Sequence, residues 1–142
     1  MNDERQFCTF YLKNLFFGVE VLNVQEVLRY QDMTRVPLAP DVVKGLINLR
    51  GQIVTAIDLR KRLHMDPREN EELPMNVVLK TDEGAVSLLV DEIGDVIEVN
   101  DNNFEEPPET VNNVTRELVK GVYKLEEQLL LILDTEKAVN VA

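Results

Sequence analysis

Residues 44–63 read KGLINLRGQIVTAIDLRKRL, and residues 120–139 read KGVYKLEEQLLLILDTEKAV. The second stretch is the first shifted by 76 positions without a gap. The identical pairs are Lys44/Lys120, Gly45/Gly121, Leu49/Leu125, Gln52/Gln128, Asp58/Asp134 and Lys61/Lys137. Two apolar hairpins can look alike by chance. Identity in the turn, the cap and the helix of an ungapped window instead favours an internal duplication.

An earlier part of each copy corresponds more weakly, at a shift of 69. There the apolar residues Val19, Val21, Val24, Val27 and Leu28 align with Leu88, Val90, Ile93, Val96 and Ile97. We therefore expect one domain over residues 1–142, with a first barrel repeat at about 7–65 and a second at about 75–139. The acidic, polar stretch 67–74 between them is predicted to be a linker.

Short apolar runs bounded by turns predict strands along both copies. Hairpins are predicted at 46–49 with 53–57 and at 118–125 with 128–133. Further strands are predicted at 7–12, 17–21, 76–80, 85–90 and 95–99. About five strands per copy favour an all-β fold of two small barrels packed side by side, because small antiparallel sheets remove their free edges by curling closed. The apolar run 129–133 predicts a strand buried on both faces.

Polar residues placed before apolar turns predict short helices. Asp58 and Asp134, equivalent in the repeat, would each cap a helix that follows their hairpin. Asn23, with Glu26 three residues later, has the spacing of a capping box. A helical turn is therefore predicted over 24–28.

The composition disfavours several classes of protein. A chain of 142 residues with 44% hydrophobic residues can bury a core without disulfides, and Cys8 is its single cysteine. The net charge is −11 and the longest basic cluster is Arg60-Lys61-Arg62, so nucleic acid and anionic membrane surfaces are disfavoured as partners. The sequence has no apolar run of about 18 residues and no signal-peptide pattern. We therefore expect a cytoplasmic protein that does not insert into a membrane.

The sequence offers little for catalysis. His64, the one histidine, follows a short basic helix and is expected at the surface, whereas Cys8 lies on an apolar strand face and is expected in the core. One Cys and one His cannot assemble an ordinary structural zinc site. We expect no enzyme activity, no catalytic residue, no metal and no cofactor. A carboxylate-dependent hydrolase stays as an alternative, which a structure without a pocket of convergent acids would argue against.

One turn separates the two copies. Residues 48–51 read NLRG, and the equivalent residues 124–127 read KLEE. The fold evidently does not require Arg-Gly at this turn, because the second copy lacks it. A positive φ would explain Gly51 but not Arg50. Glu26 is a candidate partner for Arg50, and an exposed pair would add only about 0–1 kcal/mol to stability, so recognition accounts better for the arginine.

Four stretches around these residues carry a family resemblance: 17–27 (FGVEVLNVQEV), 34–40 (TRVPLAP), 44–51 (KGLINLRG) and 56–60 (AIDLR). Val90-Asp91, the diproline 107–108 and LILD at 131–134 agree with it. The sequence resembles the CheW-like chemotaxis coupling protein family over residues 7–139. The VPLAP and NLRG stretches are specific for this family when they occur together at this spacing.

The resemblance implies two five-stranded barrels of the SH3-like type. It also implies an adaptor that joins the cytoplasmic tip of transmembrane chemoreceptors to the regulatory domain of a CheA-type histidine kinase, recruited to receptor arrays. The receptor-binding residues that it implies, with Arg50 as charged anchor, are Val24, Glu26, Gly45, Asn48, Arg50 and Gly51. Residues that contact the kinase stay unassigned, since no short motif marks them. The alternative is a scaffold of the same family in a non-motility sensory pathway, which would bind a kinase or another partner without chemoreceptors.

Overall fold

A computed structural model describes residues 4–69, 72–82 and 84–140. The strands are β1 (Glu4–Leu12), β2 (Leu15–Glu20), β3 (Val24–Leu28), β4 (Val43–Leu49), β5 (Gln52–Asp58), β6 (Met75–Thr81), β7 (Gly84–Val90), β8 (Glu92–Asn100), β9 (Phe104–Glu105), β10 (Val119–Lys124) and β11 (Leu129–Leu133). The helices are α1 (Leu59–Arg62), α2 (Asn113–Leu118) and α3 (Thr135–Val139), with 3₁₀ turns η1 (Val21–Asn23) and η2 (Asp101–Asn103).

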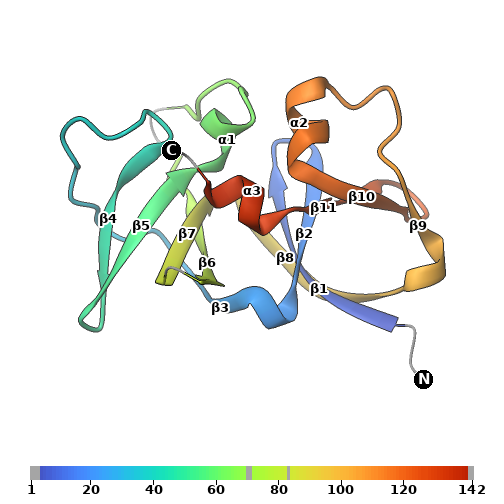
Figure 1. Cartoon of the computed structure of the whole chain (residues 1–142), viewed down its shortest axis with the longest axis horizontal. Coiled ribbons are helices and arrows are strands. Elements are labelled where there is room, and N and C mark those ends of the chain that lie inside the picture. The colour runs from blue at the N-terminus through green and yellow to red at the C-terminus, as the bar shows by residue number, and fades with distance from the viewer. Residues whose placement is uncertain (1–3, 70–71, 83, 141–142) are drawn as a thin grey trace.

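The strands form two sheets of matching topology. One sheet has the order β8-β1-β2-β11-β10-β9, and the other has the order β3-β6-β7-β5-β4. In each sheet one parallel pair joins two antiparallel hairpins, β2 with β11 in the first and β5 with β7 in the second. Both sheets curl into small barrels that lie side by side (Figure 1), which confirms the predicted all-β fold of two barrels. The two-residue β9 adds a sixth strand to one of them.

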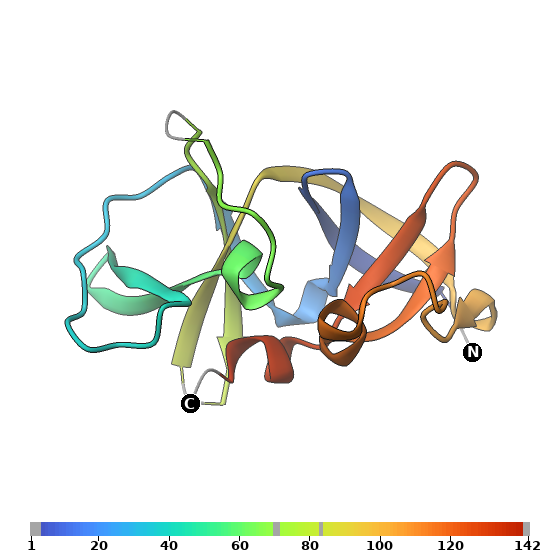
Figure 2. The same ribbon diagram turned by 90° about the horizontal axis from the view of Figure 1, so that it is seen from above.

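The barrels do not coincide with the two sequence copies, and this corrects the boundaries expected for them. Strands β3 to β7, within residues 24–90, form what we call the continuous barrel, although β6 and β7 belong to the second copy. Strands β1, β2 and β8 to β11 form the split barrel, from the two ends of the chain. Each copy therefore contributes its first hairpin to one barrel and its later strands to the other, as the crossing ribbons show (Figure 2).

The stretch 67–74 does not link the two barrels, contrary to the prediction. Residues 67–74, of which 70–71 lie outside the described residues, connect α1 to β6 within the continuous barrel. The chain instead passes between barrels at two short places: from β2 to β3 through η1, and from β7 to β8 at Asp91. We refer to these as the first crossing and the second crossing.

Three apolar clusters hold the molecule together. One fills the continuous barrel around Ile47 and Val54, and one fills the split barrel around Phe7 and Tyr123. The largest lies between the barrels, and we call it the shared core. In β11, Leu130 and Ile132 face the split-barrel core, while Leu131 and Leu133 face the shared core. Side chains alternate along a strand, so this strand is buried on both faces, as its apolar run predicts.

The repeated Asp58 and Asp134 cap α1 and α3, as predicted. Their carboxylates accept hydrogen bonds from the backbone N–H groups of Lys61 and Lys137, at 3.4 and 3.2 Å. The same short helix therefore follows the second hairpin strand in both copies, and one local rule fixes it twice.

The repeated glycines Gly45 and Gly121 lie where another segment crosses their strands. A Cβ on Gly45 would lie 2.8 Å from the Thr34 carbonyl oxygen, and one on Gly121 would lie 2.7 Å from the Glu105 carbonyl oxygen. Thr34 exchanges two backbone hydrogen bonds of 2.8 Å with Leu46, so this crossing segment closes the continuous barrel. Only glycine allows so close an approach of two backbones.

The helical turn predicted over 24–28 is wrong, because these residues form β3. Val24 pairs with Leu79 of β6 and Glu26 with Val78, with a bulge at Gln25 between the pairs. The bulge breaks the two-residue alternation of a strand, which left apolar spacing that matched a helix. Asn23 lies within η1 and caps no helix.

Candidate functional site

The hairpin between β4 and β5 ends in a two-residue turn. Leu49 pairs with Gln52, and between them Arg50 has φ +50° and Gly51 has φ +88°. Positive φ at both central residues is the signature of a type I′ hairpin turn. Asn48 secures the turn, because its Oδ1 accepts a hydrogen bond of 2.9 Å from the backbone N–H of Gly51. The positive φ predicted for Gly51 is confirmed.

The turn presents Arg50 to Glu26 on β3. An Nη of Arg50 donates to Oε2 of Glu26, so the pair expected from the sequence forms. The arginine side chain is 71% exposed and the carboxylate 21% exposed. Water screens such a pair, so its contribution to stability is about 0–1 kcal/mol. The pair orients an exposed guanidinium, whose planar fork suits a carboxylate or carbonyl of a partner.

Four of the six predicted receptor-binding residues, Glu26, Asn48, Arg50 and Gly51, meet at this turn. Val24 is half-buried and packs against the apolar core between the barrels. Gly45 is buried beneath the segment that closes the continuous barrel. These two shape the strands that carry the site and add little exposed surface to it.

Several neighbours of the turn were not predicted from the sequence. Gln25 donates a hydrogen bond of 3.2 Å to Gln52 Oε1, which ties β3 to the hairpin a second time. Val27 follows Glu26 on β3, and Ile53 lies opposite Asn48 on the hairpin. Both are exposed apolar residues. Their only sequence signal is proximity to Glu26 and Arg50, and the helical interpretation of β3 hid it.

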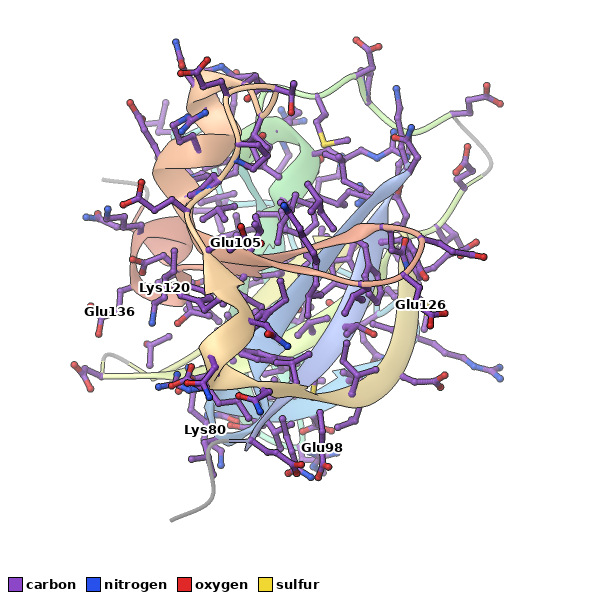
Figure 3. The ribbon with its side chains drawn as sticks, turned by 90° about the vertical axis from the view of Figure 1, so that its right-hand side faces the viewer. Lys80, Glu98, Glu105, Lys120, Glu126 and Glu136 are labelled. Carbon is purple, nitrogen blue, oxygen red and sulfur yellow. The ribbon has the colours of Figure 1, made fainter. Side chains whose placement is uncertain are left out.

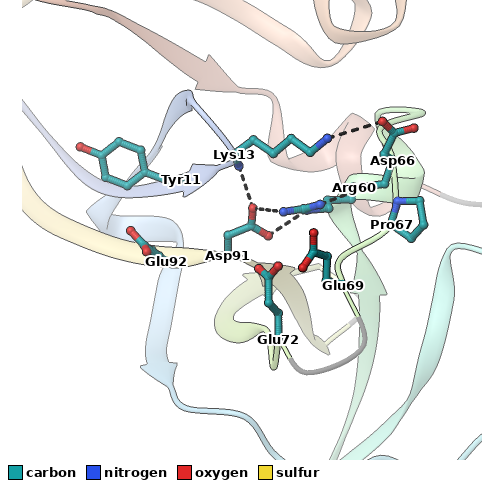
Figure 4. Close-up of a pocket in the computed structure, with 9 residues that line it drawn as sticks. All are labelled: Tyr11, Lys13, Arg60, Asp66, Pro67, Glu69, Glu72, Asp91 and Glu92. Atoms are coloured by element: carbon teal, nitrogen blue, oxygen red, sulfur yellow. Dashed lines mark hydrogen bonds and ion pairs between the residues drawn. The ribbon is translucent and has the colours of Figure 1, made fainter.

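A second cluster of charges lies at the second crossing (Figure 4). Arg60 donates to both oxygens of Asp91, from Nε at 2.9 Å and from Nη2 at 2.5 Å. Arg68 Nε lies 2.8 Å from Oδ1 of Asp91 without forming a hydrogen bond, and the Lys13 backbone N–H donates to Oδ2 at 2.7 Å. The side chains of Arg60, Arg68 and Asp91 are only 6, 9 and 12% exposed. We call these three residues the crossing network.

The crossing network borders a cavity of about 560 Å³ that the carboxylates of Glu69, Glu72 and Glu92 also line. Burial acts to raise the pKa of Asp91. Hydrogen bonds from Arg60 and the Lys13 N–H, with the charge of the two arginines, outweigh burial and lower that pKa overall. Asp91 is therefore held ionised, with both oxygens occupied. This cavity does bring acids together, so the condition that would argue against the hydrolase alternative is not met, although the ionised Asp91 is itself unsuited to donate a proton.

His64 is exposed, as expected for a surface histidine. Cys8 is half-buried against the shared core, and burial raises the pKa of its thiol, so it is less reactive than a free thiol. Within residues 4–69, 72–82 and 84–140 there is no cluster of His, Cys, Asp and Glu that could hold a metal ion. Over the same described ranges, no helix combines the length and apolarity needed to cross a bilayer.

Two packed barrels, with an exposed guanidinium held at the tip of one hairpin, define a double-barrel protein-interaction module. Comparison with known proteins shows the family to which the chain belongs. The CheW-like domain matches residues 6–142, so the chain belongs to the CheW-like family.

Relatives and a solved structure agree with this assignment. The chain is 31% identical to the chemotaxis protein CheW of Treponema pallidum over 142 residues, covering 96% of this chain and 84% of that protein. It is 32% identical to the chemotaxis protein CheW of Klebsiella aerogenes over 136 residues, covering 96% and 82%. The scaffolding protein TtCheW from Thermoanaerobacter tengcongensis has a similar structure, with a TM-score of 0.81 at 28% identity, covering 91% of this chain and 88% of that chain.

Proposed function

We propose that the chain is a chemotaxis adaptor that joins the cytoplasmic tip of chemoreceptors to the regulatory domain of a CheA-type histidine kinase. The observation that carries this proposal is the exposed Arg50–Glu26 pair, which occurs at only one of two equivalent hairpins. The fold does not require an arginine at this position, since Glu126 occupies the equivalent position in the second copy. Receptor binding would recruit the adaptor to membrane-associated arrays.

The receptor site would be the face around the β4–β5 turn. Arg50 offers charge, Asn48 and Gln52 offer polar contacts, and Ile53 offers exposed apolar surface. A helical hairpin with apolar and polar residues at its tip would match this mixture, with the apolar side chains as anchors and the guanidinium fixing orientation.

The kinase site requires a different surface, because an adaptor holds both partners at once. Leu22 in η1 is 85% exposed and Val96 on β8 is 57% exposed. Leu22 lines a cavity of about 540 Å³ together with Glu98, which shares a face of β8 with Val96. This surface combines exposed Leu22 and Val96 with charged residues such as Arg5 and Glu20, and lies at the first crossing and along the split barrel, away from the β4–β5 turn. We assign the kinase domain to it.

The test is capture of a receptor-tip fragment and of the kinase regulatory domain, each measured separately. Arg50→Ala is expected to lose receptor capture and keep kinase capture, and Leu22→Glu is expected to do the reverse. Glu126→Ala, at the equivalent turn position of the second copy, is the matched control and is expected to keep both. Receptor capture by Arg50→Ala equal to that of the wild type would remove Arg50 from the site. Kinase capture without any receptor capture by the wild type would favour the non-motility scaffold.

A further inference from the structure

The two crossings between barrels occupy equivalent places in the duplicated chain but are built differently. At the shift of 69, Asp91 in the second crossing corresponds to Leu22 in the first. At the shift of 76, Arg60 corresponds to Glu136. The nearly buried Asp91 and Arg60 of one crossing thus stand where the other crossing has an exposed leucine and an exposed acid.

The second crossing is tied to both barrels. Asp91 accepts from Lys13 in the β1–β2 turn of the split barrel, and its own N–H donates to the Tyr11 carbonyl oxygen at 3.0 Å. On the other side it holds Arg60 of α1 and Arg68, both of the continuous barrel. Arg68 also reaches the Leu89 carbonyl oxygen at 3.1 Å. Asp91 therefore connects the two barrels, through nearly buried arginines of the continuous barrel and through backbone hydrogen bonds with the split barrel.

The first crossing has an open cleft in the equivalent place. A cavity of about 740 Å³ is lined there by polar residues of both barrels, including Lys80, Lys120, Asp82 and Glu136. Lys80, Lys120 and Glu136 lie on the same side of the molecule (Figure 3). All four are exposed, and no ion pair between them spans the cleft in the part of the chain that the structure describes. Shared apolar packing holds the barrels together on this side, with Arg62 of α1, which donates to the carbonyl oxygens of Lys137 and Asn140 at 2.9 and 3.3 Å. No carboxylate pairs with an arginine there as Asp91 does at the second crossing, within the part of the chain that the structure describes.

We propose that Asp91, Arg60 and Arg68 are positioning residues that fix the angle between the two barrels, so that the receptor and kinase surfaces keep a defined relation. The proposal rests on the proposed adaptor function, because fixed geometry between two surfaces matters only to a protein that bridges two partners. The network forms the stiff edge of the junction. Movement between the barrels takes place on the side of the open cleft, where exposed polar groups can separate into water.

Apolar packing alone fixes orientation poorly, because it is non-directional. Hydrogen bonds from a planar guanidinium to both oxygens of a carboxylate fix direction as well as distance. Removing the Asp91 charge would leave the nearly buried Arg60 without its ion-pair partner and Arg68 with Asp58 alone, 3.4 Å away, and Arg60 would turn toward solvent. The shared core would persist and the angle between the barrels would become variable.

The first test measures the angle directly and needs no partner. Spin labels are placed at Lys44→Cys on β4 and Glu117→Cys on α2, in a Cys8→Ser background, and pulsed electron resonance gives the distance distribution between barrels. We expect a narrow distribution for the parent, about a doubling of its width for Asp91→Asn, and no change for Glu136→Gln, the matched control at the first crossing. A folded Asp91→Asn protein with the parent width, or equal broadening by Glu136→Gln, would overturn the proposal.

Arg68→Lys provides a milder variant if Asp91→Asn does not fold. Lysine keeps the charge but cannot reach Asp91, Asp58 and the Leu89 carbonyl together. Its distribution should also broaden, and the parent width here would overturn the proposal.

The second test uses both partners. Asp91→Asn should bind the receptor fragment and the kinase domain separately as the wild type does, and should form the three-part complex about tenfold less well. A merely structural role would weaken all three measurements together. Loss of both single affinities in a folded variant would therefore count against positioning. If the wild type binds neither partner, the adaptor function fails while the distance measurement still decides the role of the network.

Discussion

The hairpins β4–β5 and β10–β11 derive from one repeated sequence yet end differently. The first closes over Arg50 and Gly51 in a two-residue turn. The second keeps the same register and closes over Glu126 and Glu127, with a hydrogen bond of 2.9 Å from Leu125 N–H to the Gln128 carbonyl oxygen. Both turns connect strands of the same layout. The residues and the charge of the turn are therefore free to vary in this fold, and the adaptor proposal assigns the arginine in one of them to binding.

The comparison separates shared positions from unshared ones. Leu49 and Leu125 each pack against the core of their own barrel, and the glycines and aspartates repeated around them have structural roles in both copies. Arg50, Gly51 and Asp91 have no like residue in the other copy. Substitutions at shared positions should lower the free energy of unfolding by similar amounts in the two copies. Substitutions at unshared positions should have effects that depend on the contacts that each residue makes in its own copy.

The largest effect is expected at the second crossing. Asp91→Asn should lower the free energy of unfolding by about 3–5 kcal/mol, because it leaves the nearly buried Arg60 without its ion-pair partner and Arg68 with Asp58 alone. Glu136→Gln, at the exposed equivalent of Arg60, should change it by less than about 0.5 kcal/mol. Urea denaturation at pH 7 measures both. Equal losses for the two variants would erase the difference between the crossings.

The stability difference between the wild type and Asp91→Asn should depend on pH. The pKa of Asp91 is lowered in the folded protein, so its contribution to stability is present above the unfolded value of about 3.9 and is lost as pH falls through the folded value. The stability gap between wild type and Asp91→Asn should be constant from about pH 8 to 5 and shrink below about pH 4. A gap that stays undiminished in acid would show that the charge of Asp91 is not its cause.

An intermediate effect is expected at the repeated glycines. Gly45→Ala and Gly121→Ala should each cost about 1–3 kcal/mol, because the new methyl group meets a backbone carbonyl in both barrels. The neighbouring exposed lysines are controls, and Lys44→Ala and Lys120→Ala should change stability by less than about 0.5 kcal/mol. Thermal unfolding of all four compares the copies. A loss of stability in only one copy would contradict the equivalence of the segments that lie against the two glycines, Thr34 in one barrel and Glu105 in the other.

A smaller effect is expected at the hairpin turn. Gly51→Ala should cost about 1–2 kcal/mol, since φ is +88° there although the space around the glycine is open. Glu127→Ala, at the equivalent position of the second turn, should be near neutral. Chemical denaturation distinguishes the two, and an unchanged Gly51→Ala protein would show that the turn relaxes to accept a side chain.

The smallest effect is expected for the ion pair itself. Arg50→Ala, Glu26→Ala and their combination should each change the free energy of unfolding by less than about 1 kcal/mol, with a coupling energy below about 0.5 kcal/mol. A double-mutant cycle on stability measures this. A coupling above about 2 kcal/mol would make the pair a structural element of the fold and weaken its assignment to binding.

Local patterns in the sequence were sufficient for several elements. The apolar run of β11 predicted burial on both faces, and the repeated aspartates predicted two capped helices, because each of these features depends on neighbours in the chain. The bulge at Gln25 defeated the same reasoning, since it removes the alternation by which a strand is recognised. The pairing of β3 with β6 decides its conformation, and that pairing is not visible locally.

The candidate site was predicted in part for a similar reason. Comparing one copy with the other identified Arg50, because an unshared charge between apolar strands is visible in the sequence, and Glu26 followed as its candidate partner in the same copy. The crossing network has no such signal. Arg60 and Asp91 lie 31 residues apart, and their equivalents in the other copy share no chemistry with them. The exchange of strands between copies was likewise hidden, because either assignment of hairpins to barrels satisfies the same local patterns.

The exchange of strands has a consequence for how the chain folds as it is made. The continuous barrel uses residues 24–90 and can close once they have left the ribosome, whereas the hairpin β1–β2 emerges first and must wait for β8 and β11. During that interval Phe7 and Phe16 lack the core partners that β11 brings. Cutting the gene between its two copies would yield no complete barrel from either half. A fragment that forms a single barrel should instead be sought by expressing the middle of the chain, residues 24–90, on its own.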